Sequence, residues 1–596
     1  MQTFEQVHYS VTVDSIAGHT FKIIQTINFA DQVDIKIKLP AWIPGSYMIR
    51  DFAKNIVSLK AYDDNQNSLD IEKLDKQTWK VKAGSGKIHI ESIVYAFDLS
   101  VRSAYICDEY AFFNGTSVFF EVEGYSGPCS VEINLPATKL DTWSVATAML
   151  ETQSNKLTKK FSADNYQTLI DHPVIIGELD ITYFKVQEVE FEFVLTGSHQ
   201  VDTDRICRDL PKICEHHLAL FNENTPINRY VFITLLCQSG FGGLEHSHST
   251  VLQFARNQLP SKAQQHKMPD GYRTFLSLCS HELFHTWHVK RTKPAEFIDL
   301  DLSKETYSEQ LWIYEGFTSY IDDLSLLRCE LIDVPSYFEV IGQTLTRLKR
   351  NPGYLKQTVT ESSYDAWTRF YQQDASAANN IVSYYAKGAE IALCLDLLIR
   401  KESANRFTIF DLLKRLWQQF GYVNIGTQND SIQTILKQNL NINLDEFLET
   451  ALYTTTPLPT EQLLADFGVD MHYRARKDAN DKGGKPADET LSIDFGASFE
   501  AAATGISILQ VLEGSPAYLA GLQIKDNLIA IEQWQVNKDS VFTTLENYSE
   551  QPTVKLFVFR DGKLKTFDMP IKNAAKDTIY LTTSNLQKQA LWLNAQ

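Results

Sequence analysis

Two histidines with a glutamate between them are the first residues of this sequence that could do chemistry. His281, Glu282 and His285 lie in the segment Ser280–His288 and form the pattern H-E-x-x-H. On an α-helix, positions 281 and 285 differ by about 40° in azimuth and roughly 6 Å along the axis, so both imidazoles can reach one metal ion. Glu282 can then reach a water on that metal and act as a general base. The pattern alone also fits a buried helix with two hydrogen-bonded histidines.

A catalytic zinc site needs a third protein ligand and one open position for water. The candidate third ligand is Glu315, in the segment Trp312–Tyr320. Residues 286–314 leave room for a helix end, a turn and the start of an antiparallel helix, from which a carboxylate can face His285. Two imidazoles and one carboxylate suit zinc, and we expect one Zn²⁺ per chain.

Other residues near this pair could compete for the metal. His288 lies on the same face as His281, but the rise of roughly 10 Å between them prevents three ligands of one straight helix from closing a tetrahedron. Glu305 and Glu309 are further acidic candidates. Both lie in a polar stretch that is typical of a solvated face, so Glu315 remains the preferred ligand.

The elements that must position these residues follow from the hydrophobic period, which changes along the chain. Residues 1–175 alternate with period 2, as over 6–13, 21–29 and 88–95, and predict an all-β domain. From about residue 200 the period becomes 3.6, with one apolar strand over 230–236. Helical patterns cover residues 204–221, 310–327, 380–401, 407–420 and 444–453. After a Pro- and Thr-rich stretch at 454–460, strand patterns return over 506–511, 528–531 and 554–559.

We therefore predict a multidomain α+β protein. The N-terminal domain, residues 1–175, is all-β and sandwich-like; residues 176–457 form a mainly helical domain with one small sheet; and residues 458–596 form a linker and a small β domain. A chain of 596 residues is long enough for several domains.

The composition excludes some classes of function. The net charge is −18, and no stripe of Lys and Arg offsets it, so nucleic acid and anionic membranes are not expected partners. The start of the chain lacks the basic and apolar regions of a signal peptide, and no run of about 18 apolar residues exists. Eight scattered cysteines without C-x-x-C indicate a reducing compartment. We therefore expect a cytoplasmic location.

At this point the sequence resembles a known family. H-E-x-x-H followed by W-x-x-E-G-x-T-x-Y is similar to the glycyl-aminopeptidase family of zinc metallopeptidases, relatives of thermolysin. The resemblance continues in the segments 40–47, 113–116, 242–246 and 384–388, and residues 514–522 look like part of a PDZ domain. It implies a thermolysin-like catalytic domain over 176–457 and a PDZ-like domain at the C-terminal side.

The resemblance also implies roles for further residues. In related aminopeptidases a Gly-rich loop ends in an acidic residue that holds the free α-amino group of the substrate, and Glu245 occupies that position. Gly242 and Gly243 would let the backbone approach the peptide. A tyrosine shortly before Lys-Gly donates a hydrogen bond to the oxyanion; Tyr385 fits this place and Tyr384 is the alternative.

One position departs from thermolysin itself. Where thermolysin has an aspartate four residues after its zinc glutamate, this sequence has Ser319. Asp322 or Asp323 could supply the missing support for a ligand histidine. In the PDZ-like domain, the stretch 495–499 is only a loose match to a carboxylate-binding loop.

The preferred hypothesis is a zinc aminopeptidase that acts on peptides with a free N-terminus and, by resemblance, favours glycine or alanine there. A peptide C-terminus is a second expected partner, at the PDZ-like domain. A PDZ-guided zinc endopeptidase is one alternative. A non-catalytic peptide-binding adaptor is another, and the intact H-E-x-x-H with Glu315 argues against it.

Overall fold

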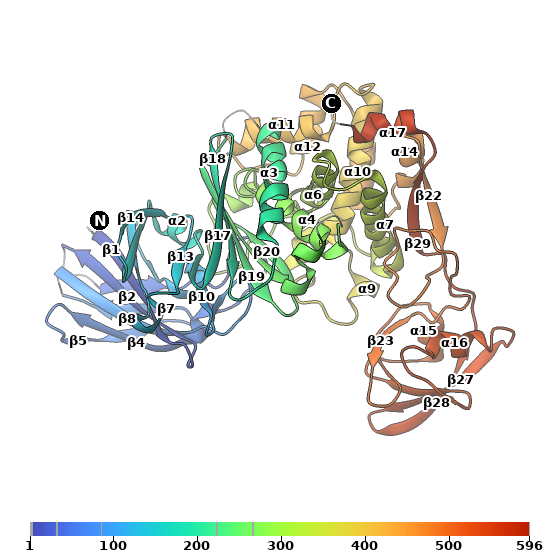
Figure 1. The fold of residues 1–596 in the computed structure, drawn as a ribbon, viewed down its shortest axis with the longest axis horizontal. Coiled ribbons are helices and arrows are strands. Elements are labelled where there is room, and N and C mark those ends of the chain that lie inside the picture. Colours follow the sequence, from blue (N-terminus) through green and yellow to red (C-terminus); the bar gives the residue numbers. More distant parts are fainter. Residues whose placement is uncertain (1–3, 31–33, 85, 222–224, 265–267, 595–596) are drawn as a thin grey trace. The chain divides into compact units, whose positions relative to one another are not determined.

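The protein is described by a computed structural model that covers residues 4–30, 34–84, 86–221, 225–264 and 268–594. The helices and strands are labelled along the ribbon in Figure 1. The chain divides into two compact units. Unit 1 comprises Met1–Thr306 and Trp417–Thr427, and unit 2 comprises Tyr307–Leu416 and Gln428–Gln596. Strands dominate unit 1, whereas unit 2 contains most of the helices and a C-terminal β domain. The predicted multidomain α+β class is confirmed.

Unit 1 begins with an eight-stranded sheet that is built from alternating sequence. Its adjacent strands β1 (Phe4–Ser15), β2 (Thr20–Phe29) and β8 (Gly86–Tyr95) bury every second side chain over most of their length. Successive side chains of a strand point to opposite faces, so the buried ones all lie on the face that covers the large core of this domain. The three strands predicted at these positions are confirmed.

A second sheet of unit 1 carries part of the site. In spatial order its strands are β17 (Leu179–Val186), β18 (Val189–Thr196), β19 (Arg229–Cys237), β21 (Ser249–Ala255) and β20 (Phe241–Glu245). The central strand β19 is buried along almost its whole length, as its continuous apolar sequence predicts. Helix α3 (Thr203–Leu220) contacts β17, and α4 (Asp270–Phe284) contacts β20 and β21.

The Gly-rich stretch before Glu245 differs from the prediction. It was expected to be a loop, but residues 241–245 form β20, which pairs antiparallel with β21 from Phe241↔Phe254 to Glu245↔Thr250. Glycine is unfavourable in strands, so local composition favoured a loop and pairing with β21 overrides it. β20 is the last strand of this sheet among the described residues, so one of its edges is open.

Unit 2 is organised around packed helices. The predicted helix over 310–327 is present as α5 (Leu311–Tyr314) and α6 (Gly316–Arg328), which meet at Glu315. Hydrogen bonds from Glu315 N–H to the Leu311 carbonyl and from Ser319 N–H to the Glu315 carbonyl, each 2.9 Å, continue across the junction. The junction therefore fixes the backbone of Glu315 between two helical segments.

The other predicted helices are also present. They are α10 (Tyr384–Glu402), α11 (Ile409–Leu416) with a π-turn over Trp417–Gly421, and α13 (Asp445–Tyr453). α6 and α10 approach closely where Gly316 faces Gly388. A Cβ on Gly316 would lie 2.4 Å from the Gly388 Cα, so only two glycines permit this contact.

The C-terminal β domain has its own core. Its sheet contains β23 (Ala497–Ala501), β24 (Ile506–Val511), β25 (Asn527–Ile531), β27 (Thr553–Arg560) and β28 (Lys563–Pro570), in that spatial order. The short helices α15 (Pro516–Ala520) and α16 (Val541–Glu546) pack with it. The buried residues of these elements form a cluster separate from the other cores.

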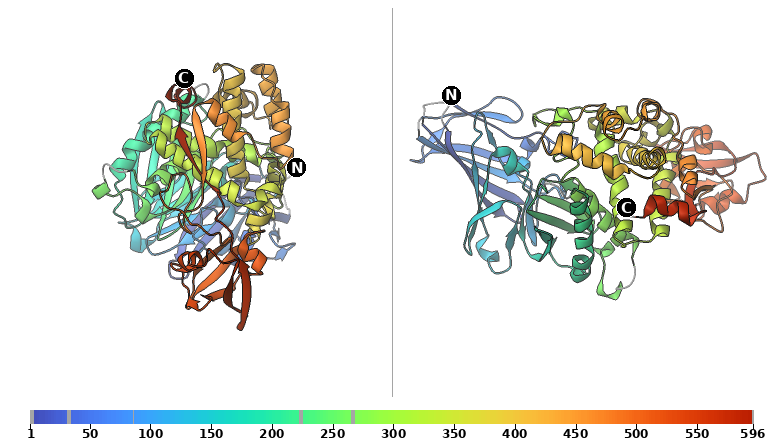
Figure 2. Two further views of the ribbon diagram at one scale, coloured as in Figure 1. Left: turned by 90° about the vertical axis from the view of Figure 1, so that its right-hand side faces the viewer. Right: turned by 90° about the horizontal axis from the view of Figure 1, so that it is seen from above.

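Part of the chain after residue 458 packs on the helices instead. β22 (Val469–Arg474) pairs with β29 (Thr578–Thr583), and Ile579 N–H donates to Thr346 Oγ1 of α7 (Val334–Arg350) at 2.9 Å. The final described helix, α17 (Leu586–Leu593), lies beside the helices of unit 2 (Figure 2). Its Trp592 is fully buried and donates from Nε1 to the Tyr320 hydroxyl on α6 at 3.0 Å.

None of the helices in the described part of the chain combines the length and the apolar character that crossing a bilayer requires.

We expect that Trp592→Ala lowers the free energy of unfolding of unit 2 by about 3–5 kcal/mol, because it leaves a cavity and removes the hydrogen bond to Tyr320. Urea unfolding followed by circular dichroism measures this. The matched control is Leu591→Ala, next to it on α17 but 44% exposed, which should cost less than about 1 kcal/mol. Equal effects of the two substitutions would contradict the docking of α17 through Trp592.

Candidate active site

The H-E-x-x-H segment lies at the C-terminal end of α4. His281 and Glu282 belong to the last turn of the helix, and His285 is the residue that caps it, with φ −59° and ψ −17°. The centroids of the His281 and His285 rings are 4.6 Å apart, and the rings are nearly perpendicular. The two imidazoles therefore project on one side of the helix end, as the four-residue spacing predicts.

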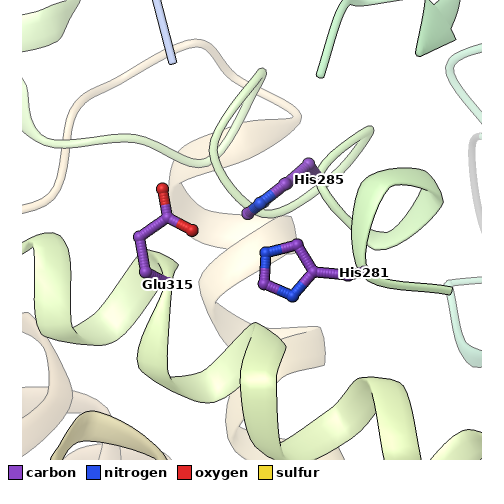
Figure 3. Close-up of side chains that lie close together, drawn as sticks. All are labelled: His281, His285 and Glu315. Carbon is purple, nitrogen blue, oxygen red and sulfur yellow. The ribbon is translucent and has the colours of Figure 1, made fainter. Parts of the chain in front are cut away.

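Glu315 joins this pair. Ligand atoms of His281, His285 and Glu315 all lie within 4.8 Å of one another. Figure 3 shows the Glu315 carboxylate and the two rings close together. The side chains of His285 and Glu315 are buried, and that of His281 is partly exposed. The structure thus brings together the three residues that the sequence proposed as ligands.

The donor set fits a zinc ion. Two imidazoles and one carboxylate are a known ligand combination for catalytic zinc, and three protein ligands leave one position open. His285 Nδ1 lies 2.9 Å from the backbone carbonyl of His288, a contact that requires the proton on Nδ1. The other nitrogen, Nε2, is then the one available to a metal.

The competing ligand candidates are placed elsewhere. His288 is buried and supports His285 through its backbone carbonyl. Glu309 accepts a hydrogen bond from Asn429 Nδ2 at 2.9 Å in an exposed setting. Neither of them, nor Glu305, belongs to a group of three potential ligands in the described part of the chain.

Glu245 lies beside the catalytic segment at the end of β20. Its carboxylate, that of Glu282 and an imidazole nitrogen of His285 are within 4.8 Å of one another. Gly243, two residues earlier, faces Glu282 so closely that a Cβ there would lie 1.9 Å from Oε1. The open edge of β20 therefore runs directly past the proposed base.

The N-terminal domain contributes a residue that sequence reasoning did not assign. Gly45 has φ +89°, and a Cβ on it would lie 2.5 Å from Glu245 Oε1. The loop that carries it is held by Trp42, which is buried and donates from Nε1 to the Lys304 carbonyl at 2.8 Å. Its Pro-Gly turn was visible in the sequence, but no local pattern indicated that it meets Glu245, 200 positions later.

A cavity of about 230 Å³ opens beside Glu245. Aromatic and aliphatic side chains form one part of its wall, and Asp171, Lys290 and Lys293 line the other. Asp171 pairs with Lys290 at 2.8 Å and with His246 at 3.1 Å. Burial alone would raise the pKa of Asp171, but these two partners hold it well below its usual range. Burial, assisted by Lys290, lowers the pKa of Lys293 to about 8.

The two candidate tyrosines begin α10. Ser383 caps this helix, and its hydroxyl accepts a hydrogen bond from Ala386 N–H at 3.3 Å. The pKa of Tyr385 is raised well above its ordinary value by burial and by the nearby Glu315 carboxylate. The Tyr385 phenol therefore lies near the proposed metal ligand and keeps its proton at neutral pH. Tyr384 is fully buried, and its ring stacks on that of Tyr385 at 4.7 Å.

Residues 8–178 match the peptidase M61 N-terminal domain, residues 274–391 match the M61 glycyl aminopeptidase, and residues 493–571 match a PDZ domain. A solved structure of an aminopeptidase N family protein from Idiomarina loihiensis is 41% identical, with a TM-score of 0.95 over 99% of this chain and 100% of that one. The chain belongs to the M61 glycyl aminopeptidase family.

This family membership confirms the resemblance that the sequence motifs indicated. The protein is a metallopeptidase. An M1 zinc metallopeptidase from Deinococcus radiodurans also aligns, at 16% identity and a TM-score of 0.46, over 77% of this chain and 96% of that one. The comparison with curated proteins returned no match.

We expect that Gly243→Ala in this M61 peptidase lowers kcat by about 100-fold or more, because the new methyl group must displace the Glu282 carboxylate. Steady-state kinetics on a glycyl or alanyl anilide measures this. Gly242→Ala is the matched comparison, because its Cβ would have no neighbour nearer than 3.8 Å. Its kcat should be retained, and only KM should rise if the substrate passes close to this position. Full activity of Gly243→Ala would show that the carboxylate need not stay where it is.

Proposed function

We propose that this chain is a zinc-dependent aminopeptidase that removes the N-terminal residue of peptides. One observation carries the proposal: the proximity of Glu245 to Glu282 and His285, within 4.8 Å. In an amino acid the α-nitrogen lies about 2.5 Å from its own carbonyl carbon. An ammonium bound by Glu245 therefore brings the first peptide bond, and no later one, beside the base.

We propose that His281, His285 and Glu315 hold the zinc ion. When bound, zinc supplies a Lewis acid that polarises the scissile carbonyl and makes water more acidic. Glu282 accepts the proton of the attacking water and passes it to the leaving amine. The Tyr385 hydroxyl donates a hydrogen bond to the oxyanion, a role that its raised pKa supports.

The open edge of β20 supports a binding mode for the rest of the peptide. An extended chain can add to such an edge through main-chain hydrogen bonds. Gly242 and Gly243 lie on this strand and have no side chains that would hinder the approach of a peptide. The substrate would then run along β20 with its ammonium at Glu245. The PDZ domain offers a second binding place, for the C-terminus of a peptide.

For the first residue we propose a preference for glycine or alanine. The family description and the close packing of Gly45 against Glu245 support a confined space around the amine. A larger side chain of the first substrate residue would have to enter the cavity of about 230 Å³ beside Glu245. The substrate panel therefore includes larger first residues. Anilides of glycine, alanine, leucine, phenylalanine and glutamate compare these cases, and equal kcat/KM for all five would contradict the preference.

Glu282→Gln should lower kcat by roughly three or more powers of ten while zinc remains bound, because the base is lost and the ligands are not. Anilide hydrolysis and metal analysis of the same preparation test this. Glu489→Gln, an exposed glutamate in unit 2, is the control and should leave both readouts unchanged. Chelation should abolish activity, and zinc should restore it. Turnover that is indifferent to chelator would exclude a metal mechanism.

Glu245→Ala should raise KM and remove the preference for a free N-terminus, because the ammonium loses its partner. Glu245→Gln keeps the shape beside Gly45 and removes only the charge. The readout is the ratio of kcat/KM for a free peptide to that for its N-acetylated form. If the unmodified enzyme cleaves both forms equally fast, the endopeptidase alternative is favoured and the role of Glu245 is wrong.

A further inference from the structure

A cavity of about 600 Å³ lies in unit 2, between the PDZ domain and the helices. On one side it is lined by residues 495–498, which lead into β23, and by Phe542 of α16. On the other side it is lined by Arg347 of α7. The two walls come from segments about 150 positions apart, and both are within the described residues of one unit.

The PDZ wall has the form of a peptide-binding groove. β23 is the first strand in the sheet order, so its edge opposite β24 is left unpaired by the residues that the structure describes. Phe542 is half-buried and meets the buried Phe495 edge to face, with ring centroids 6.5 Å apart, so the cavity wall beside this edge is apolar. An added strand along β23 would direct the last side chain of a peptide to this surface and its carboxylate into the cavity.

An acidic side chain lies beside the PDZ loop that would receive this carboxylate. PDZ domains capture a terminal carboxylate with backbone N–H groups of this loop. Here the Asp494 carboxylate lies near the Gly496 N–H. A peptide carboxylate at this place therefore needs a positively charged donor.

Arg347 is such a donor. Its side chain is exposed to the cavity, and it makes no hydrogen bond or ion pair with any described residue. An unpaired guanidinium at the end of an apolar groove fits a carboxylate, which it can bind through two parallel hydrogen bonds.

The other charges around the cavity are mostly paired. Asp577 accepts from Arg350 and from Arg476, each at 3.2 Å. Asp481 pairs with Arg474 of β22, and Lys482 is exposed. Apart from Arg347 and Lys482, the remaining charge on the lining is the carboxylate of Asp494, so the unpaired cations outnumber the unpaired anion.

The PDZ domain is held in place against the segment that precedes α10. In α9 (Ala377–Asn380), the Asn379 side chain accepts from Glu513 N–H at 2.9 Å and donates to the Val511 carbonyl at 2.8 Å. Glu513 also pairs with Lys356. These contacts tie the loop after β24 to the helical part of the unit, so Arg347 and the groove face one cavity in a fixed relation.

We infer that the free C-terminal carboxylate of a peptide that adds to β23 is bound by Arg347 of α7, beside the PDZ loop. The ligand is a polypeptide tail with an apolar last residue. This inference rests on the peptide partner in the proposed function and names the residue that recognises it. The binding site is then shared between the PDZ domain and the peptidase helices.

The test is fluorescence anisotropy with the full chain and peptides labelled at the N-terminus with fluorescein. The panel ends in valine, leucine, alanine or phenylalanine, each as the free acid and as the carboxamide. The label blocks the N-terminus, so binding is read without turnover, and a failure here leaves the proposed hydrolysis untouched. At least one free acid should bind at least about tenfold more tightly than its amide.

Arg347→Gln should reduce the affinity for the free acid at least about tenfold, to that of the amide, and Arg347→Lys should retain part of it. Lys565→Ala, an exposed cation on β28, is the control and should change nothing. Thermal melting checks that the variants are folded. The inference is overturned if no free acid binds, if Arg347→Gln binds normally, or if Asp494→Asn tightens binding while Arg347→Gln has no effect.

Discussion

The site depends on two buried carboxylates that lie close together. Glu245 and Glu282 share a group with His285 in which ligand atoms are within 4.8 Å. Two like charges at about 4 Å repel by about 4 kcal/mol at the effective dielectric of a protein. Compensating positive charge would offset this repulsion. In the proposed function that charge comes from the zinc ion and from the substrate ammonium.

Glycines allow this crowding. Gly45 and Gly243 approach Glu245 and Glu282 from two directions, and any side chain at either position would occupy the space of the carboxylate. In unit 2, Gly316 does the same for the packing of α6 on α10, which brings Glu315 and Tyr385 near each other. At each of these positions a glycine loses backbone conformational entropy on folding, and in return the chain packs closely around the polar side chain. The positions of the site carboxylates therefore depend on neighbours without side chains.

Local patterns were sufficient for part of this structure. Alternation located β1 and β2, the 3.6 period located α3 and α10, and the spacing of His281, His285 and Glu315 pointed to a group that the structure brings together. These features depend on residues near one another in sequence, or on chemistry that few residue types can perform. The aminopeptidase family, too, was recognisable from its motifs.

What could not be predicted depends on distant contacts. The resemblance implied a loop where β20 lies. Its glycines disfavour a strand, and only pairing with β21 overrides that preference. Gly45 meets Glu245 across 200 positions, and Arg347 meets the PDZ groove across about 150. The residues around a surface arginine or a Pro-Gly turn do not indicate which distant segment it will contact, because tertiary packing determines that contact.

The docking of α17 has a consequence for how the enzyme is made. Tyr320, five residues beyond Glu315, accepts a hydrogen bond from Trp592 Nε1, which lies 272 positions later in the chain. A ribosome needs roughly 15 to 50 s to synthesise that interval. The bond between Trp592 and Tyr320 can therefore form only after almost the whole chain has been synthesised.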